Sequence, residues 1–133
     1  MKEEETKQPT IFLIEEDDET RRALVRNLRA YGYRVLVAFD EEDALGRAGG
    51  GGVGPDLVLA NLVGRTAEEV LGVGRRVRER AGCGGHTPLV AMPERYDKGL
   101  EDTEVNVGGN DWVFYLGEEP DRLRDLLSRL TGG

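Results

Sequence analysis

The sequence predicts an α/β protein in which helices cover both faces of one doubly wound parallel sheet. Five short apolar runs are each too short for a helix, and most lack the alternation of a half-buried strand. Segments with apolar residues at helical spacing separate most of these runs, which is the order of repeated strand–helix units. The length of 133 residues suits a single domain that buries roughly two-thirds of its unfolded surface.

The first unit follows a polar segment, residues 1–9, which we expect to be a disordered tail. Thr10–Ile14 reads as a buried strand, and it stops at five consecutive acids, Glu15–Glu19. Asp17 or Asp18 can cap the helix that follows, and Gly32 can end it. The apolar stripe of that helix consists of Leu24, Val25, Leu28 and Tyr31.

The second unit and the central strand come next. Residues 33–39 are rich in aromatic and β-branched side chains and predict a strand. Asp40 then caps a helix that should reach about Ala48. Residues 49–54 are a glycine-rich connector, after which Leu57–Ala60 forms a continuous apolar run typical of a buried central strand.

The third helix and the fourth strand are predicted with less regular patterns. Residues 68–81 place valines on one helical face, although Gly72 and Gly74 should weaken that helix locally. Pro88–Met92 is a short apolar run with proline at its entry, where a missing N–H donor matters least.

The last third of the chain should contain a short or irregular fourth helix, a fifth strand and a final helix. Residues 94–109 begin like a helix, but glycines and valines erode the pattern. Trp112–Tyr115 reads as the fifth strand. Pro120 opens a helix whose apolar stripe is Leu123, Leu126, Leu127 and Leu130, so the domain should span residues 10–131.

Composition narrows the classes of partner. The formal net charge of -8 and a pI near 4.8 argue against nucleic acid and anionic membranes, because the field of the protein would repel phosphates. No apolar run is long enough to predict a membrane span. Cys83 is the only cysteine, and Cys83 with His86 has no second pair that would complete a zinc site. We therefore expect a cytoplasmic protein.

The residue that closes the central strand is Asn61. In an open α/β sheet, ligands bind beyond the carboxyl ends of the strands. An aspartate at that position could accept a phosphoryl group or hold a cation, whereas a neutral carboxamide has almost no nucleophilicity. The alternative is that Asn61 only bonds loop backbone. Glu15 and Glu16 end the neighbouring first strand, and they either bind a cation weakly or only favour a helix N-terminus.

Four stretches together resemble the receiver domain of response regulators. Residues 12–16 resemble its first strand with an acidic pair, and residues 55–61 resemble the strand that carries the phosphoacceptor aspartate. Residues 88–94 and 108–116 resemble the fourth strand and the G-A-x-D-Y-x-x-K-P stretch of that family. The resemblance extends from about Thr10 to Leu130 and implies a flavodoxin-like fold with strand order 2-1-3-4-5.

Carried over position by position, the resemblance implies a degenerate phosphorylation site. Asn61 replaces the phosphoacceptor, Pro93 replaces the hydroxyl residue and Tyr115 replaces the lysine. Glu15 and Glu16 keep an acidic pair that could hold Mg²⁺ only weakly, since each is longer than aspartate. Trp112 stands where the family has a switch aromatic, and it either anchors a partner or fills the core.

The resemblance therefore implies a phosphorylation-independent protein-interaction module of two-component signalling that is not an enzyme and needs no cofactor. Its partner would be a histidine kinase or an output protein, and the chain would be a monomer or a weak homodimer. One alternative is a receiver still regulated by a cation or by phosphate through Glu15, Glu16 or Asp17. A less favoured alternative is a flavodoxin-like domain that binds a small molecule.

Overall fold

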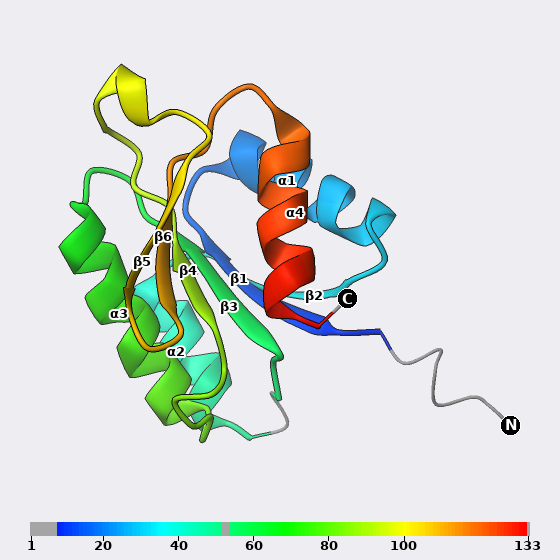
Figure 1. Ribbon diagram of the computed structural model, residues 1–133. Helices are drawn as coiled ribbons and strands as arrows, with labels where there is room; N and C mark the ends of the chain where they lie inside the picture. The colour runs from blue at the N-terminus through cyan, green and yellow to red at the C-terminus, as the bar shows by residue number, and fades with distance from the viewer. Residues whose placement is uncertain (1–7, 52–53, 133) are drawn as a thin grey trace, which may run out of the picture.

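The computed structural model describes residues 8–51 and 54–132 and contains one six-stranded sheet between two layers of helices (Figure 1). The sheet has the order β2-β1-β3-β4-β6-β5, and every adjacent pair is parallel except β5 with β6. The strands are β1 (Thr10–Glu15), β2 (Arg34–Ala38), β3 (Leu57–Asn61), β4 (Leu89–Ala91), β5 (Glu104–Gly108) and β6 (Asp111–Phe114). The helices are α1 (Asp18–Ala30), α2 (Glu41–Gly49), α3 (Ala67–Arg80), the 3₁₀ helix η2 (Lys98–Leu100) and α4 (Pro120–Leu130).

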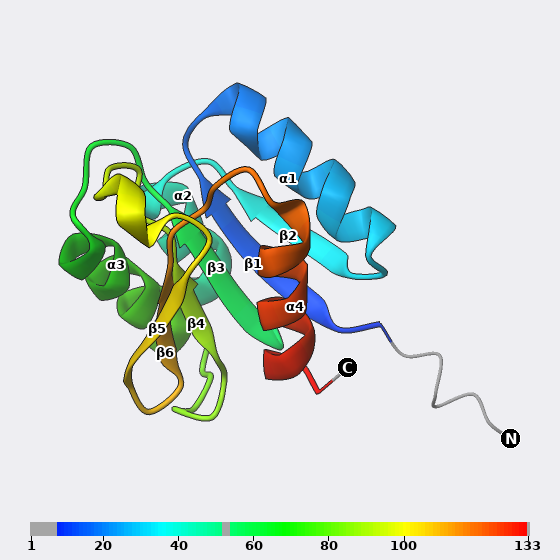
Figure 2. The ribbon, with the colours of Figure 1, turned by 45° about the horizontal axis from the view of Figure 1, so that its top comes forward.

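The predicted α/β class and the doubly wound parallel sheet are confirmed. Helices α1 and α4 lie on one face of the sheet, and α2 and α3 lie on the other (Figures 1 and 2). The five predicted strands are β1, β2, β3, β4 and β6, in the predicted relative order. Most of the predicted tail and two residues of the predicted connector, residues 1–7 and 52–53, lie outside the described residues.

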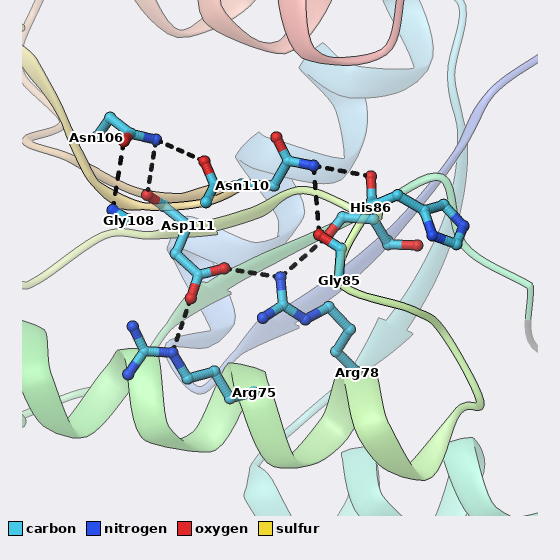
Figure 3. Close-up of polar contacts among 10 residues, drawn as sticks. Arg75, Arg78, Gly85, His86, Asn106, Gly108, Asn110 and Asp111 are labelled. Carbon is cyan, nitrogen blue, oxygen red and sulfur yellow. Dashed lines mark hydrogen bonds and ion pairs between the residues drawn. The ribbon is translucent and has the colours of Figure 1, made fainter.

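The region between β4 and β6 differs from the prediction. The short or irregular helix expected here is the 3₁₀ helix η2, but the prediction of five strands missed β5, which pairs with β6 in antiparallel fashion. Val105 and Val107 alternate with polar residues, which favours a strand. Gly108 and Gly109 both have positive φ, 129° and 53°, as a tight turn requires. Asn106 closes the turn by donating to Gly109 O at 3.0 Å, as Figure 3 shows.

Each face of the sheet carries its own buried cluster. On the face of α2 and α3 the sheet contributes Phe12, Ile14, Val58, Ala60, Leu89, Ala91 and Val113. On the face of α1 and α4 it contributes Ile11, Leu13, Leu57, Leu59, Val90, Met92 and Phe114. Strands β1, β3 and β4 supply both clusters, which explains why their sequences are continuously apolar.

Packing against the sheet explains why a glycine, Gly74, lies inside helix α3. A Cβ at Gly74 would overlap the Leu89 side chain, so α3 approaches β4 too closely for any larger residue. Gly72 has only the Arg76 guanidinium within 4 Å, at 3.6 Å. The helix is started by a reciprocal capping box between Thr66 and Glu69.

A partly buried ion-pair cluster fastens α3 to the amino end of β6 (Figure 3). The Asp111 carboxylate accepts from Arg75 Nε at 2.8 Å and from Arg78 Nη1 at 2.7 Å. Arg78 also donates to the carbonyl of Thr87 at 2.9 Å. Burial alone would raise the pKa of Asp111, but the two arginines outweigh it and hold that pKa below its ordinary value. This cluster lies at the sheet end opposite the carboxyl end of β3.

Among the described residues, no helix is both long and apolar enough to cross a membrane.

Candidate functional site

Glu15 and Asn61 meet at the carboxyl ends of β1 and β3, where they are register partners. Asn61 Nδ2 donates to Glu15 Oε1 at 2.8 Å, and the backbone N–H of Asp17 donates to Glu15 Oε2 at 3.1 Å. The Glu15 side chain is completely buried. Both of its oxygens are therefore satisfied by donors of the protein itself, and the carboxamide of Asn61 is one of them.

Burial dominates the electrostatics of Glu15. The pKa of Glu15 is raised from its ordinary value to about 7, chiefly because the carboxyl is removed from water and to a smaller extent because of the charge of Asp17. The hydrogen bonds from Asp17 and Asn61 and the charge of Arg21 act in the opposite direction without cancelling this effect. The pocket thus contains an acid that is partly protonated at neutral pH.

The loop after β3 is held by two carboxylates from different parts of the chain. Glu16 Oε1 accepts from Val63 N at 2.7 Å, and Glu94 Oε1 accepts from Gly64 N at 3.0 Å. Consecutive backbone N–H groups in a loop make a natural anion site. Here the carboxylates of the protein occupy these N–H groups.

Asp17 has a structural task at the start of α1. Its side chain accepts from Thr20 N at 2.7 Å and caps the helix. This hydrogen bond lowers the pKa of Asp17 below its ordinary value. The sequence offered Asp17 or Asp18 as the cap of this helix, and the structure has Asp17 in that role.

Pro93 links two adjacent clefts at the same end of the sheet. One, of about 500 Å³, is lined by Asn61 and Pro93 among others. The next, of about 520 Å³, is lined by Pro93 and Tyr115 among others. The ring of Tyr115 packs against Tyr96, with centroids 5.1 Å apart and planes tilted by 59°. The five residues of the predicted pocket thus lie at the carboxyl end of the parallel strands. Of these five, only Glu15 and Asn61 form a hydrogen bond with each other.

Three residues of this region were missed by sequence reasoning. Glu94 binds the loop after β3, and Arg95 and Lys98 line the cleft that contains Asn61. Tyr115, which the resemblance placed at the lysine position, brings no positive charge, whereas Lys98 from η2 brings one to the cleft that Asn61 lines. The available signal was a set of charged residues directly after the fourth strand, which is where parallel-sheet sites collect side chains.

Trp112 packs against the buried cluster on the face of α1 and α4. Its indole Nε1 is buried and has no hydrogen-bond partner among the described residues. This position favours the core-filling interpretation over the partner-anchoring one, because the polar end of the ring faces no solvent.

The side chains of the acidic pair do not fit a Mg²⁺ ion. Such an ion requires several oxygen ligands in near-octahedral arrangement, whereas Asn61 directs N–H groups at Glu15. The oxygens of Glu15 and one oxygen of Glu16 accept backbone or amide hydrogen bonds. Within residues 8–51 and 54–132, no group of three or more His, Cys, Asp or Glu side chains could hold a metal ion.

No protein-family model matches this sequence, and no curated protein matches it either. Solved structures do match. The receiver domain of a sensor histidine kinase from Pseudomonas aeruginosa, with a magnesium ion coordinated in its active site cleft, is 22% identical with a TM-score of 0.69, covering 96% of this chain and 100% of that chain. A response regulator from Thermotoga maritima is also 22% identical, with a TM-score of 0.68 and the same coverage.

A third structure adds a phosphoryl analogue. The response regulator TrrA from Thermotoga maritima, in complex with Mg²⁺ and BeF, is 16% identical with a TM-score of 0.67, covering 92% of this chain and 99% of that chain. At these identities the likeness shows the fold, which is the flavodoxin-like receiver fold.

Proposed function

We propose that this chain is a receiver-like domain of two-component signalling that acts without phosphorylation, as a protein-interaction module. The observation that carries the proposal is the hydrogen bond from Asn61 Nδ2 to the buried carboxylate of Glu15. The position from which an aspartate would attack a phosphodonor is a carboxamide, and its amide is committed to a neighbouring acid.

The chemistry of the surrounding groups supports the same conclusion. Phosphoryl transfer to a carboxylate needs a cation against the phosphoryl oxygens and donors that hold the product. The loop amides of Val63 and Gly64 are bound by Glu16 and Glu94. Pro93 offers no hydroxyl. Lys98 and Arg95 supply positive charge in the cleft, but the group at the end of β3 that they face is the carboxamide of Asn61 and not a carboxylate.

The structural neighbours supply the contrast. One neighbour holds magnesium in its active site cleft and another was solved with Mg²⁺ and BeF. In this chain, by contrast, the donors and acceptors at the corresponding end of the sheet bind one another. A partner would therefore meet a single constitutive surface, and its affinity should not respond to Mg²⁺ or to beryllofluoride. The partner class is a histidine kinase or an output protein in the cytoplasm.

Intact-mass analysis after incubation with Mg²⁺ and acetyl phosphate tests the proposal. We expect no mass gain of one phosphoryl group for the wild-type chain or for Asn61→Asp. The triple variant Asn61→Asp, Pro93→Thr, Tyr115→Lys restores the nucleophile, the hydroxyl and the lysine, and it is the variant in which labelling becomes feasible. If the wild-type chain gains a phosphoryl group on Asp17 or Glu16, the proposal is wrong and the chain is a receiver regulated by phosphorylation.

A thermal melt with and without Mg²⁺ distinguishes the cation-regulated alternative. We expect the same melting temperature in Mg²⁺ and in matched ionic strength supplied by NaCl. A specific rise with Mg²⁺ that Glu16→Gln abolishes would show that the acidic pair binds a cation, contrary to the hydrogen bonding of Glu15 and Glu16.

A further inference from the structure

A basic and apolar groove is lined by residues of α1 and of the edge strand β2 with the residue that follows it. Figure 2 shows α1 lying beside β2 on one face of the sheet. The volume of the groove is about 660 Å³, and none of its lining residues is acidic. The lining residues are Arg21, Arg22, Val25, Arg26, Arg29, Val37 and Phe39. Of its four arginines, Arg21 is paired with the exposed Asp18 beside the groove, so the other three give the groove most of its positive charge.

Three of these arginines form an exposed stripe. Arg22, Arg26 and Arg29 are spaced i, i+4 and i+7 along α1, so they share one face of the helix over roughly 10 Å. None of the three forms an ion pair with an acid of residues 8–51 or 54–132, the part of the chain described here. The stripe therefore presents positive charge to solvent rather than neutralising a neighbouring element.

An exposed aromatic ring stands at one end of the groove. Phe39 is 52% exposed, and the Arg21 guanidinium lies over its ring, 4.6 Å from the centroid. The Phe39 backbone N–H donates to Asp43 Oδ2 at 2.9 Å, and Asp40 caps α2 immediately after it. The backbone that carries the ring is therefore fixed, and the Arg21 guanidinium covers one side of the ring.

We propose that this groove binds an acidic segment of a partner protein, with apolar side chains of that segment placed on Val25, Val37 and Phe39. Charge complementarity with the arginine stripe supplies attraction and orientation. The apolar floor and the exposed ring supply the buried contact that an interface needs at its centre.

A nucleic acid fits the same surface less well. Its phosphates would match the arginines, but a polyanion extends beyond the groove into the field of a protein whose net charge is -8. A short acidic peptide is neutralised within the groove, and its apolar side chains use a floor that phosphates cannot. Arg21 donates to the Glu15 carbonyl at 2.9 Å, but the stripe of Arg22, Arg26 and Arg29, on which the inference rests, lies outside the clefts around Asn61, Pro93 and Tyr115.

Selection from a random peptide display library on the immobilised full chain tests the proposal. Enriched peptides should combine Asp or Glu with Leu, Ile, Phe or Trp. A synthetic copy of the most enriched peptide, labelled with fluorescein, should bind the wild-type chain and lose at least about tenfold in affinity with Arg22→Glu, Arg26→Glu, Arg29→Glu. These residues are exposed, so circular dichroism and thermal melting should show that the variant is folded.

A matched control changes the net charge equally at exposed arginines elsewhere. Arg80→Glu, Arg122→Glu, Arg124→Glu should leave the affinity of the same peptide within about twofold. A separate variant, Phe39→Ala, should weaken binding of the peptide without altering the salt dependence of that binding.

Three outcomes would overturn the proposal. Enriched peptides could show no acidic bias, or could bind the stripe variant as well as the wild type. Alternatively, a fluorescent oligothymidylate could bind the wild-type chain more tightly than the selected peptide and lose that affinity in the stripe variant, which would assign the groove to nucleic acid.

Discussion

Replacing the buried acid of the pocket by its neutral isostere should stabilise the protein above neutral pH. Glu15 is completely buried, and its pKa is raised from 4.5 to about 7 in the folded state. Between these two values the folded protein retains a proton that the unfolded chain has released. Stability therefore falls as pH rises through this window, and the full penalty persists above pH 7.

The size of the penalty follows from the shift. The difference between the folded and unfolded pKa corresponds to about 3 kcal/mol, a large share of the roughly 5–15 kcal/mol by which domains are stable. In Glu15→Gln the side-chain oxygen can accept from Asp17 N, while the new NH₂ group can donate to the Asn61 carbonyl after that amide rotates. The variant should therefore keep the hydrogen bonds and lose the ionisation penalty.

Urea unfolding at a series of pH values measures this effect, with the fluorescence of Trp112 and far-UV circular dichroism as probes. Well above pH 7, Glu15→Gln should be more stable than the wild type by up to about 3 kcal/mol. Well below pH 4.5 the two proteins should be equally stable. The exposed Glu68→Gln serves as control and should not reproduce the divergence. Parallel stability curves for Glu15→Gln and the wild type across the whole window would refute the reasoning.

Four further substitutions test the pocket and the packing. Asn61→Asp should lower stability above neutral pH, since it sets a carboxylate against the buried acid, and it should gain no phosphoryl mass with Mg²⁺ and acetyl phosphate. Asp111→Asn should cost about 2–3 kcal/mol in urea unfolding because it leaves the guanidinium of Arg78, only 13% exposed, without its carboxylate. Gly74→Ala should cost about 1–3 kcal/mol from overpacking against β4, whereas Gly72→Ala should gain about 0.5–1 kcal/mol of helix propensity.

The parallel core of the fold was predictable because burial on both faces leaves a direct mark on sequence. Residues 11–14 and 57–60 are continuously apolar since each strand serves both clusters. The antiparallel edge was not predictable in the same way. Residues 104–108 carry only two valines, both exposed, so hydrophobic burial does not distinguish a strand from an irregular helix there. The glycine pair at 108–109 was the local signal that favoured a hairpin.

The site was predictable in position but not in its bonding. Parallel topology places the ends of β1 and β3 side by side, so Glu15 and Asn61 could be expected to approach one another. Nothing in the sequence indicates that Glu94 turns back to the loop after β3, because that contact joins residues 30 positions apart through a side chain on a loop. The position of Lys98 in the cleft was not predictable either, because it depends on η2, which forms where an irregular helix was expected.

The hydrogen bonds at the pocket explain why a carboxamide suits position 61. Three protein carboxyl groups, those of Glu15, Glu16 and Glu94, each accept a hydrogen bond from an N–H group of residues 61–64. An aspartate at position 61 would remove the donor that serves the most buried of these acids and would add a fourth negative charge. In a phosphate-accepting pocket, a divalent cation would have to offset that charge. Here position 61 carries no charge, and the amide of Asn61 donates to Glu15 without a cation. Asn61 and the surrounding glutamates therefore depend on one another, because replacing one of them leaves a donor or an acceptor of this set without its partner.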